Sequence, residues 1–260
     1  MNSSNCSALA CLSNGMNLTD LPMPVQVVCE AFISGLKDIL RTKLYGVYMH
    51  GAAVFQDSGP IQDIDCHVIL KTPLSEREQT NINQLFESLS KRFPSLGGEL
   101  DAFFILYGDA RKKSPPANQL RPIRDEWWAL HCTHIRAGRY LALYGPEPTE
   151  IFPATSWQDI SAALDYEIRF IEVSLKYPAY CVLNLCRIIF SFQERDVVVS
   201  KRSSGAWART RFPEWASLIE AALRYYEGNA TPNDQTYLQT EVRSFLAFAT
   251  ERIREARILS

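Results

Sequence analysis

The chain has 260 residues, 47% of them hydrophobic, which is enough for one large domain or two smaller ones with real cores. Its 27 basic and 29 acidic side chains give a net charge of −2, so no basic excess points to nucleic acid as a partner. The apolar runs fall short of the roughly 20 residues that a membrane helix needs, and we expect no membrane partner.

The first 24 residues are polar and small, without an early positive charge or a long apolar core. They predict a flexible N-terminal arm over residues 1–24 and not a secretory signal. Seven cysteines are scattered without metal-ligand spacing, and Cys66, Cys181 and Cys186 lie in apolar runs. This pattern favours reduced thiols and a cytoplasmic location.

Residues 25–153 predict an α/β (α+β) domain. Helical spacing of apolar residues predicts a first helix over 25–40, strand formers predict strands at 44–50, 63–70 and 99–107, and residues 75–93 predict a helix between the last two strands. The order of strand, helix and strand predicts a small mixed sheet.

The pattern changes after about Phe152. The stretch just before it, residues 127–145, reads as helical at first and then extended. Ser156, with Asp159 three residues on, predicts the capped start of a helix, and the next helix begins at Pro178. Two more helices follow Pro213 and Asp234. We therefore predict an all-α bundle over residues 154–260.

Asp63 and Asp65 stand one residue apart at the start of a predicted strand, so both point to one face. Adjacent carboxylates repel, and hard divalent cations prefer such oxygen ligands. Glu99 and Asp101 also share a face, on the next strand, and could supply a third carboxylate. Three carboxylates on two strands can hold two magnesium ions for in-line displacement at phosphorus. On its own, however, an Asp-x-Asp more often just ends a strand or caps a turn.

The turn "GAA", which begins with Gly51 and Ala52, offers backbone N–H groups of the kind that cradle phosphates. A turn of this type before an Asp-x-Asp strand resembles the nucleotidyltransferase superfamily. In the second half, "YCVLNLCRIIFSF" and "VVVSKRSSGAWARTRFP" resemble the C-terminal helical domain of the streptomycin/spectinomycin adenylyltransferases. "HIRAGRYLALYGPEPTEIF" resembles the domain junction of that family.

The resemblance implies roles for particular residues. Asp63, Asp65 and Asp101 would bind magnesium. Asp101 would also be the general base, with Glu99 as the second candidate because a shift of two residues keeps the same face. Gly51, Ala52 and Lys201 would contact the nucleotide. Without the resemblance, Lys201 reads as a solvated lysine at a helix start.

The implied activity is the Mg²⁺-dependent transfer of AMP from ATP to a hydroxyl of a small aminoglycoside- or aminocyclitol-like acceptor, by a monomer or a weak homodimer. Two departures from the family keep alternatives open. Ala52 replaces the serine of the turn and loses a hydrogen bond of about 1.5–3 kcal/mol at most. No acid stands just before the helix that begins at Pro178, although Glu167 and Glu172 could substitute. The acceptor could be another small molecule or a protein, or the chain could be a non-catalytic nucleotide-binding module.

Other candidate groups have simpler interpretations. Trp127 and Trp128 could stack on a ligand ring, but a core role is more common. His67 shares a face with Asp65, and we expect it to pack in the sheet. His131 and His134 have helical spacing suited to metal, yet no third ligand stands at a convincing distance in the sequence, so we expect no zinc site there.

Overall fold

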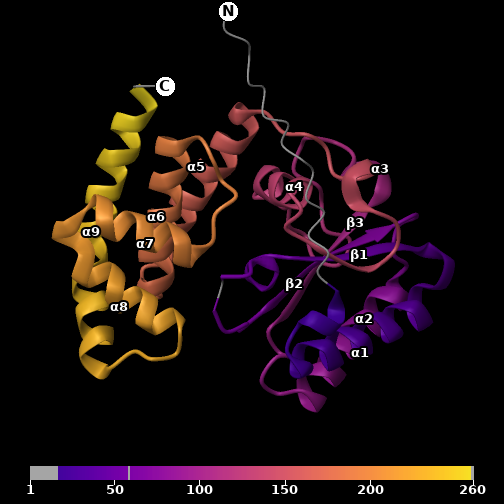
Figure 1. Cartoon of the computed structure of the whole chain (residues 1–260). Helices are drawn as coiled ribbons and strands as arrows, with labels where there is room; N and C mark the ends of the chain where they lie inside the picture. The colour runs from indigo at the N-terminus through magenta and orange to yellow at the C-terminus, as the bar shows by residue number, and fades with distance from the viewer. Residues whose placement is uncertain (1–16, 58, 259–260) are drawn as a thin grey trace, which may run out of the picture.

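The computed structural model describes residues 17–57 and 59–258, which form a sheet half and a helical half lying side by side (Figure 1). The sheet half contains α1 (Met23–Leu40), β1 (Leu44–His50), β2 (Ile64–Leu70), α2 (Glu76–Arg92), β3 (Leu100–Leu106), α3 (Tyr107–Ala110), α4 (Trp128–Arg136) and β4 (Leu141–Tyr144). The helical half contains α5 (Trp157–Val173), α6 (Pro178–Glu194), α7 (Lys201–Arg211), α8 (Ala216–Tyr226) and α9 (Pro232–Ile258).

Within the described residues, one sheet has the strand order β3-β2-β1-β4. β1 pairs antiparallel with β2 and β4, whereas β2 and β3 run parallel, so the sheet is mixed as predicted. The register places His50 opposite Asp65, and Asp65 opposite Asp101. Directly opposed residues point to the same face of a sheet. Three polar residues therefore form a row across three strands.

Helices cover both faces of the sheet, with α1 and α2 on one side and α3 and α4 on the other (Figure 1). Phe32 and Leu36 of α1 belong to the core of the first face, together with Val47. Trp128 of α4 and Tyr48 belong to the core of the second face. Side chains alternate between faces along a strand, so the row of His50, Asp65 and Asp101 lies on the side of α4.

The helical half packs around α6, most of whose apolar residues are buried. The predicted start of α5 is confirmed, because the Ser156 hydroxyl accepts a hydrogen bond from the Asp159 backbone N–H at 3.2 Å. The predicted class of the fold, a mixed-sheet domain followed by an all-α bundle, is confirmed.

α7 is a helix that the apolar pattern of the bundle did not reveal. It is mostly polar and buries only small residues, Ser204, Gly205 and Ala208. A Cβ atom on Gly205 would lie 3.1 Å from Leu223 and 3.3 Å from Leu183. Close packing of small residues therefore replaces the usual stripe of large apolar side chains.

The predicted N-terminal arm is only partly described, since residues 1–16 lie outside the described chain. Its last residues are not loose: Leu18–Asp20 form a 3₁₀ turn, and Leu21 is buried in the core of the sheet half. α1 also begins two residues earlier than predicted, at Met23, directly after Pro22. Proline at a helix start needs no backbone N–H, which explains this boundary.

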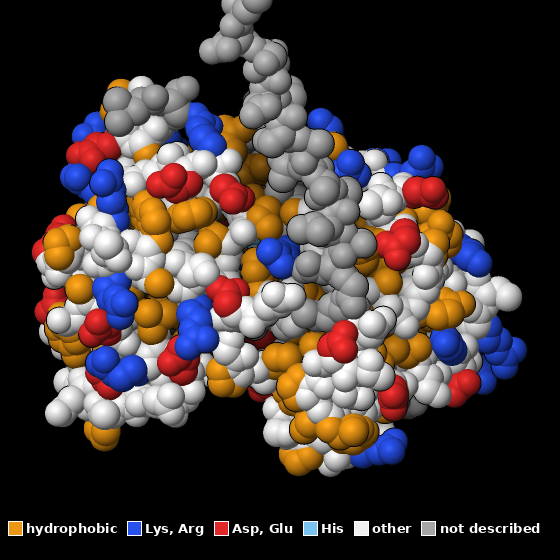
Figure 2. Space-filling view, viewed as in Figure 1, with side chains coloured by type: hydrophobic (Ala, Val, Ile, Leu, Met, Phe, Trp, Pro, Cys, Tyr) orange, Lys and Arg blue, Asp and Glu red, His pale blue; other side chains and the backbone are white. Residues whose placement is uncertain are grey.

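The cysteines, the helices and the surface charges of the described residues point to no additional site. In the described chain the cysteines at positions 29, 66, 132, 181 and 186 are free and buried. None of the described helices is both long and apolar enough to cross a membrane. On the face drawn in Figure 2, basic and acidic side chains are interspersed over both halves.

Candidate active site

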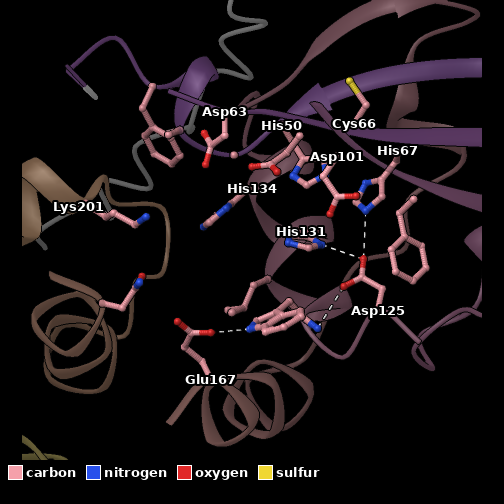
Figure 3. A pocket seen from close by; sticks show the side chains of 18 of the residues that line it. His50, Asp63, Cys66, His67, Asp101, Asp125, His131, His134, Glu167 and Lys201 are labelled. Atoms are coloured by element: carbon pink, nitrogen blue, oxygen red, sulfur yellow. Dashed lines mark hydrogen bonds and ion pairs between the residues drawn. The ribbon is translucent and has the colours of Figure 1, made fainter. Parts of the chain in front are cut away.

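A cavity of about 330 Å³ lies between the two halves, and it is lined by polar side chains from both (Figure 3). The sheet half contributes acids and histidines, whereas the helical half contributes an acid, two cations and two tyrosines. The residues used below are His50, Gly51, Ala52, Asp63, Asp65, His67, Asp101, Arg121, Asp125, Trp127, His131, Glu167, Tyr180, Arg187, Lys201 and Tyr226.

The predicted acids Asp63, Asp65 and Asp101 all line the cavity. Burial and the neighbouring Asp63 raise the pKa of Asp65 to about 7, with a further contribution from Asp101. The side chains of Asp63 and Asp65 form no hydrogen bond or ion pair with any described residue. Burial, which disfavours the charged form, and repulsion from the neighbouring carboxylates together explain the raised pKa of Asp65.

Gly51 shapes the end of β1. Its φ of 75° lies in the region that side chains other than glycine rarely adopt. A Cβ atom at this position would lie 2.3 Å from Oδ2 of Asp65. The 3₁₀ turn Ala52–Val54 follows directly, and Ala52 lines the cavity. The glycine therefore lets the backbone approach the Asp65 carboxylate closely.

Asp101 and Glu99, the two candidates for the base, differ in position. Asp101 lines the cavity, and its carboxylate accepts a hydrogen bond from Arg121 at 2.7 Å. Glu99 is not among the cavity-lining residues; its backbone carbonyl accepts a hydrogen bond from Ile64 at 3.0 Å. The structure thus brings Asp101, and not Glu99, together with the other acids.

Lys201 is half-buried at the start of α7 and faces the acids across the cavity (Figure 3). Burial and the nearby Arg187 lower its pKa. The ammonium lies 5.0 Å from the ring centre of Tyr180 and 5.7 Å from that of Tyr226. It pairs with no acid in the described part of the chain. A cation held by aromatic faces remains available to an anionic ligand.

The start of α7 is tied to the sheet half by Asp57. Its carboxylate accepts hydrogen bonds from the hydroxyls of Ser200, at 2.6 Å, and Ser203, at 2.5 Å. Ser200 is also the N-cap of α7 and accepts a hydrogen bond from the Ser203 N–H at 2.9 Å. This contact fixes the position of Lys201, the residue that follows Ser200, relative to the sheet.

Glu167 of α5 is buried in the cavity wall, 3% exposed. Its carboxylate accepts hydrogen bonds from Trp127 Nε1 at 2.6 Å and from the Tyr180 hydroxyl at 2.9 Å. Glu172, one turn later, is exposed and does not line the cavity. The two tryptophans also differ, because Trp127 lines the cavity whereas Trp128 is fully buried in the core.

The histidines His50, His67 and His131 lie together on the cavity floor, and Asp125 contacts two of them. Oδ2 of Asp125 lies 3.0 Å from His67 Nε2 and 2.8 Å from His131 Nδ1. Burial lowers the pKa of His67 despite this carboxylate. Burial also opposes protonation of His131, but Asp125 raises the pKa of that residue. His134 points elsewhere, with Nε2 2.7 Å from the Val197 carbonyl oxygen.

Sequence reasoning missed several lining residues. Arg187, Tyr226 and Asp125 were not singled out, and His50 was treated as the end of a strand. Arg187 lies inside "VLNLCR", and a cation within an otherwise apolar helix was a signal that could have been used. Asp125 stands in a charged loop, and nothing local distinguishes it from its solvated neighbours.

Comparison with known proteins agrees with this architecture. Residues 150–252 match the family model described as the C-terminal domain of aminoglycoside adenylyltransferase. The resemblance to the aminoglycoside adenylyltransferases is confirmed. The chain is 24% identical to the spectinomycin 9-adenylyltransferase of Campylobacter jejuni over 271 aligned positions, which cover 92% of this chain and 98% of that protein.

A solved structure, the spectinomycin adenyltransferase of Enterococcus faecialis with ATP and spectinomycin, shares the fold of this chain. The match has a TM-score of 0.71 at 17% identity, and it covers 88% of this chain and 98% of that one. At this identity the likeness establishes the fold. The roles of individual residues depend on the geometry of the cavity.

The residues present fit a hard divalent cation. Asp63 and Asp65 offer carboxylate oxygens, the donors that Mg²⁺ prefers, and no cationic side chain of the described residues lies within ion-pair distance of them. Gly51 keeps the space beside Asp65 Oδ2 free of a side chain. An acidic pair that is partly desolvated and lacks a counter-ion is a donor set that such a cation would stabilise.

Proposed function

We propose that the chain is a magnesium-dependent adenylyltransferase that transfers AMP from ATP to a hydroxyl of a small aminoglycoside- or aminocyclitol-like acceptor. The observation that carries this proposal is the row of Asp65 and Asp101 facing Lys201 across one cavity. Acids on one wall and unpaired cations on the other suit a metal–triphosphate ligand. We treat residues 25–153 and 154–260 as the two domains that enclose it.

The nucleotide is placed by both halves. Lys201 and Arg187 attract the phosphates from the helical wall, and the turn at Gly51 and Ala52 presents backbone next to the acids. Tyr226 and Tyr180 hold the Lys201 ammonium from its other side and offer ring faces to a base or sugar. Mg²⁺ held by Asp63, Asp65 and Asp101 would neutralise charge at the reacting phosphate.

Asp101 has the position of the general base. Its carboxylate is exposed to the cavity and would accept the proton of the acceptor hydroxyl. The hydroxyl oxygen then forms a bond to the α-phosphorus of ATP, and the bond from that phosphorus to the pyrophosphate oxygen breaks. Arg121, which holds Asp101 at 2.7 Å, keeps this carboxylate at the cavity edge before substrates bind.

The acceptor would contact the carboxylate of Glu167, although no acidic residue stands directly before α6. Glu167 reaches the same wall from the preceding helix and accepts a hydrogen bond from Tyr180 of α6. Its position, buried between Trp127 and Tyr180, supports a cationic acceptor, since a buried carboxylate favours a partner with positive charge.

The test is the intact mass of a panel of aminoglycosides and aminocyclitols after incubation with the protein, ATP and magnesium. We expect the wild type to add one adenylyl group to at least one compound. Asp65→Asn and Asp101→Asn should lose at least about 1,000-fold in rate, because a metal ligand or the base is removed. Glu99→Gln, just before the same strand, is the matched control and should retain the activity.

Unchanged transfer by Asp65→Asn would overturn the metal assignment, and loss in Glu99→Gln with activity in Asp101→Asn would exchange the base. A protein that binds magnesium and ATP but modifies no compound would favour a different acceptor or a nucleotide sensor. The Ala52 departure is the observation behind the sensor alternative. Labelled ATP offered to a cell extract separates the two, because only an enzyme would transfer label.

A further inference from the structure

Three imidazole rings from three elements meet on the cavity floor. His50 ends β1, His67 lies in β2, and His131 lies in α4. Their ring centres are 4.1, 4.5 and 5.1 Å apart. One ring nitrogen of each histidine lies within 4.8 Å of one ring nitrogen of the other two. The proposed transfer reaction does not account for this cluster, because its Mg²⁺ would be held by the carboxylates of Asp63, Asp65 and Asp101.

Asp125 organises two of the rings. It accepts from Nε2 of His67 and from Nδ1 of His131, which leaves one bare nitrogen on each ring. Metal-binding histidines characteristically donate their other N–H to a carboxylate, which orients the ring and strengthens its lone pair. Asp125 is 2% exposed, so this orienting group is fixed in the protein interior.

Two of the rings have unused hydrogen-bonding capacity. Nδ1 of His67 is buried without a hydrogen-bond partner among the described residues, and the ring is 1% exposed. The His50 ring, 7% exposed, forms no hydrogen bond with any described side chain or backbone group. Burying a polar atom without a hydrogen-bond partner costs free energy. A buried ring nitrogen that lacks a partner and lies near two other ring nitrogens therefore indicates a bound ligand.

The surroundings suit a coordinated ion. The His67 ring contacts Trp128 and Phe152, with ring centres at 5.3 and 5.8 Å. An apolar shell restricts water and strengthens coordination by neutral nitrogen donors. His134, only three residues from His131, is outside the cluster because the Val197 carbonyl oxygen engages it.

We propose that His50, His67 and His131 form a binding site for a divalent transition metal of the Zn²⁺ class, separate from the carboxylate site. Three nitrogens at 2.0–2.1 Å from one ion lie about 3.3 Å apart, so the three ring nitrogens, which lie within 4.8 Å of one another, would move closer by side-chain rotation when the ion binds. All three histidines line the cavity, so the ion could be reached from it. Imidazole favours zinc over magnesium, so the two metals use different donors in the same cavity.

The experiment measures Zn²⁺ binding to the metal-free protein by competition with a chromophoric chelator, with magnesium present in excess. We expect one Zn²⁺ per chain from this cluster. His50→Asn and His131→Asn should each weaken binding by more than about 100-fold, since losing a ligand exceeds the cost of losing an outer partner. His134→Gln and Asp63→Asn should bind as the wild type does.

Co²⁺ provides a second measurement, because it absorbs visible light much more strongly in a four-coordinate site than in a six-coordinate oxygen site such as one built from carboxylates and water. We expect this absorption in the wild type and in Asp63→Asn, and its loss in His131→Asn. The same chain is monitored by circular dichroism so that unfolded variants are recognised. Tight binding retained in both histidine variants, or binding lost in Asp63→Asn, would place the zinc at the carboxylates and overturn the proposal.

Discussion

Gly51 stands so close to Asp65 that a Cβ atom added to the glycine would lie 2.3 Å from a carboxylate oxygen. Gly51 directly follows β1, Asp65 is the second residue of β2, and the antiparallel register pairs Asp65 with His50, the residue before the glycine. The turn at Gly51 and the acidic pair are therefore one structural unit. A change in the turn must displace the acid.

Gly51→Ala tests this contact. The backbone conformation at φ 75° strains any side chain by about 1–3 kcal/mol, and the clash moves Asp65. We expect a fall of kcat/KM by at least about 100-fold and a loss of unfolding free energy in that range, measured by steady-state kinetics and urea unfolding. Gly108→Ala, where a Cβ meets nothing within 4 Å, should change neither. Full activity of Gly51→Ala would contradict the assignment.

Asp57→Ala tests the tie between the halves. Losing the acceptor of two serine hydroxyls frees the start of α7, and with it Lys201. We expect the KM for ATP to rise about tenfold, the KM for the acceptor to change little, and the unfolding free energy to fall by about 1–2 kcal/mol. Ser203→Ala removes one of the two bonds and should give an intermediate effect. Equal rises in both KM values would argue against a specific effect on the nucleotide.

Glu167→Gln tests acceptor recognition. The amide keeps the shape of the side chain, its oxygen can accept the hydrogen bond from Trp127 and its NH₂ can donate to the Tyr180 hydroxyl, but the negative charge is removed from the wall. We expect a rise of at least about tenfold in the KM for a cationic acceptor, with the KM for ATP unchanged. Glu172→Gln changes the same charge on the exposed face of the same helix and should have no effect. Equal behaviour of the two variants would exclude an acceptor role for Glu167.

His134 predicts a pH dependence of stability. Burial, together with Arg187, lowers its pKa to about 3, whereas an unfolded histidine titrates near 6.5. As the pH falls below 6.5 the unfolded chain takes up the proton first, so stability declines between pH 6.5 and 3 by up to about 1.4 kcal/mol per unit. His134→Gln lacks this group and should show a shallower decline. Urea unfolding at several pH values checks this, and parallel curves would contradict it.

Much of the site could be predicted because its chemistry is local in the sequence. Asp63 and Asp65 are two residues apart, and Gly51 closes the strand before them. Alternation along a strand was enough to place the two acids together. The next strand offered Glu99 and Asp101 as the third acid, and the resemblance to the family favoured Asp101.

The rest depends on distant contacts that no local pattern reveals. His131 was compared with His134, its neighbour on the helix, but the sheet brings it to His50 and His67 instead. Glu167 was one of two candidates on one helix, and only the packing of α5 against α6 shows which of them is buried. Lys201 follows a serine whose partner, Asp57, lies 143 residues away.

The two sides of the cavity have separate origins: the three acids come from the sheet half, whereas Lys201, Arg187 and Glu167 come from the helical half. Substitutions around Glu167 in the helical half would therefore alter the proposed acceptor pocket while the three acids of the sheet half stay in place. With this division, substitutions in the helical half would change acceptor preference while the acids of the sheet half are retained. It also means that neither half would carry the complete site if it were separated from the other.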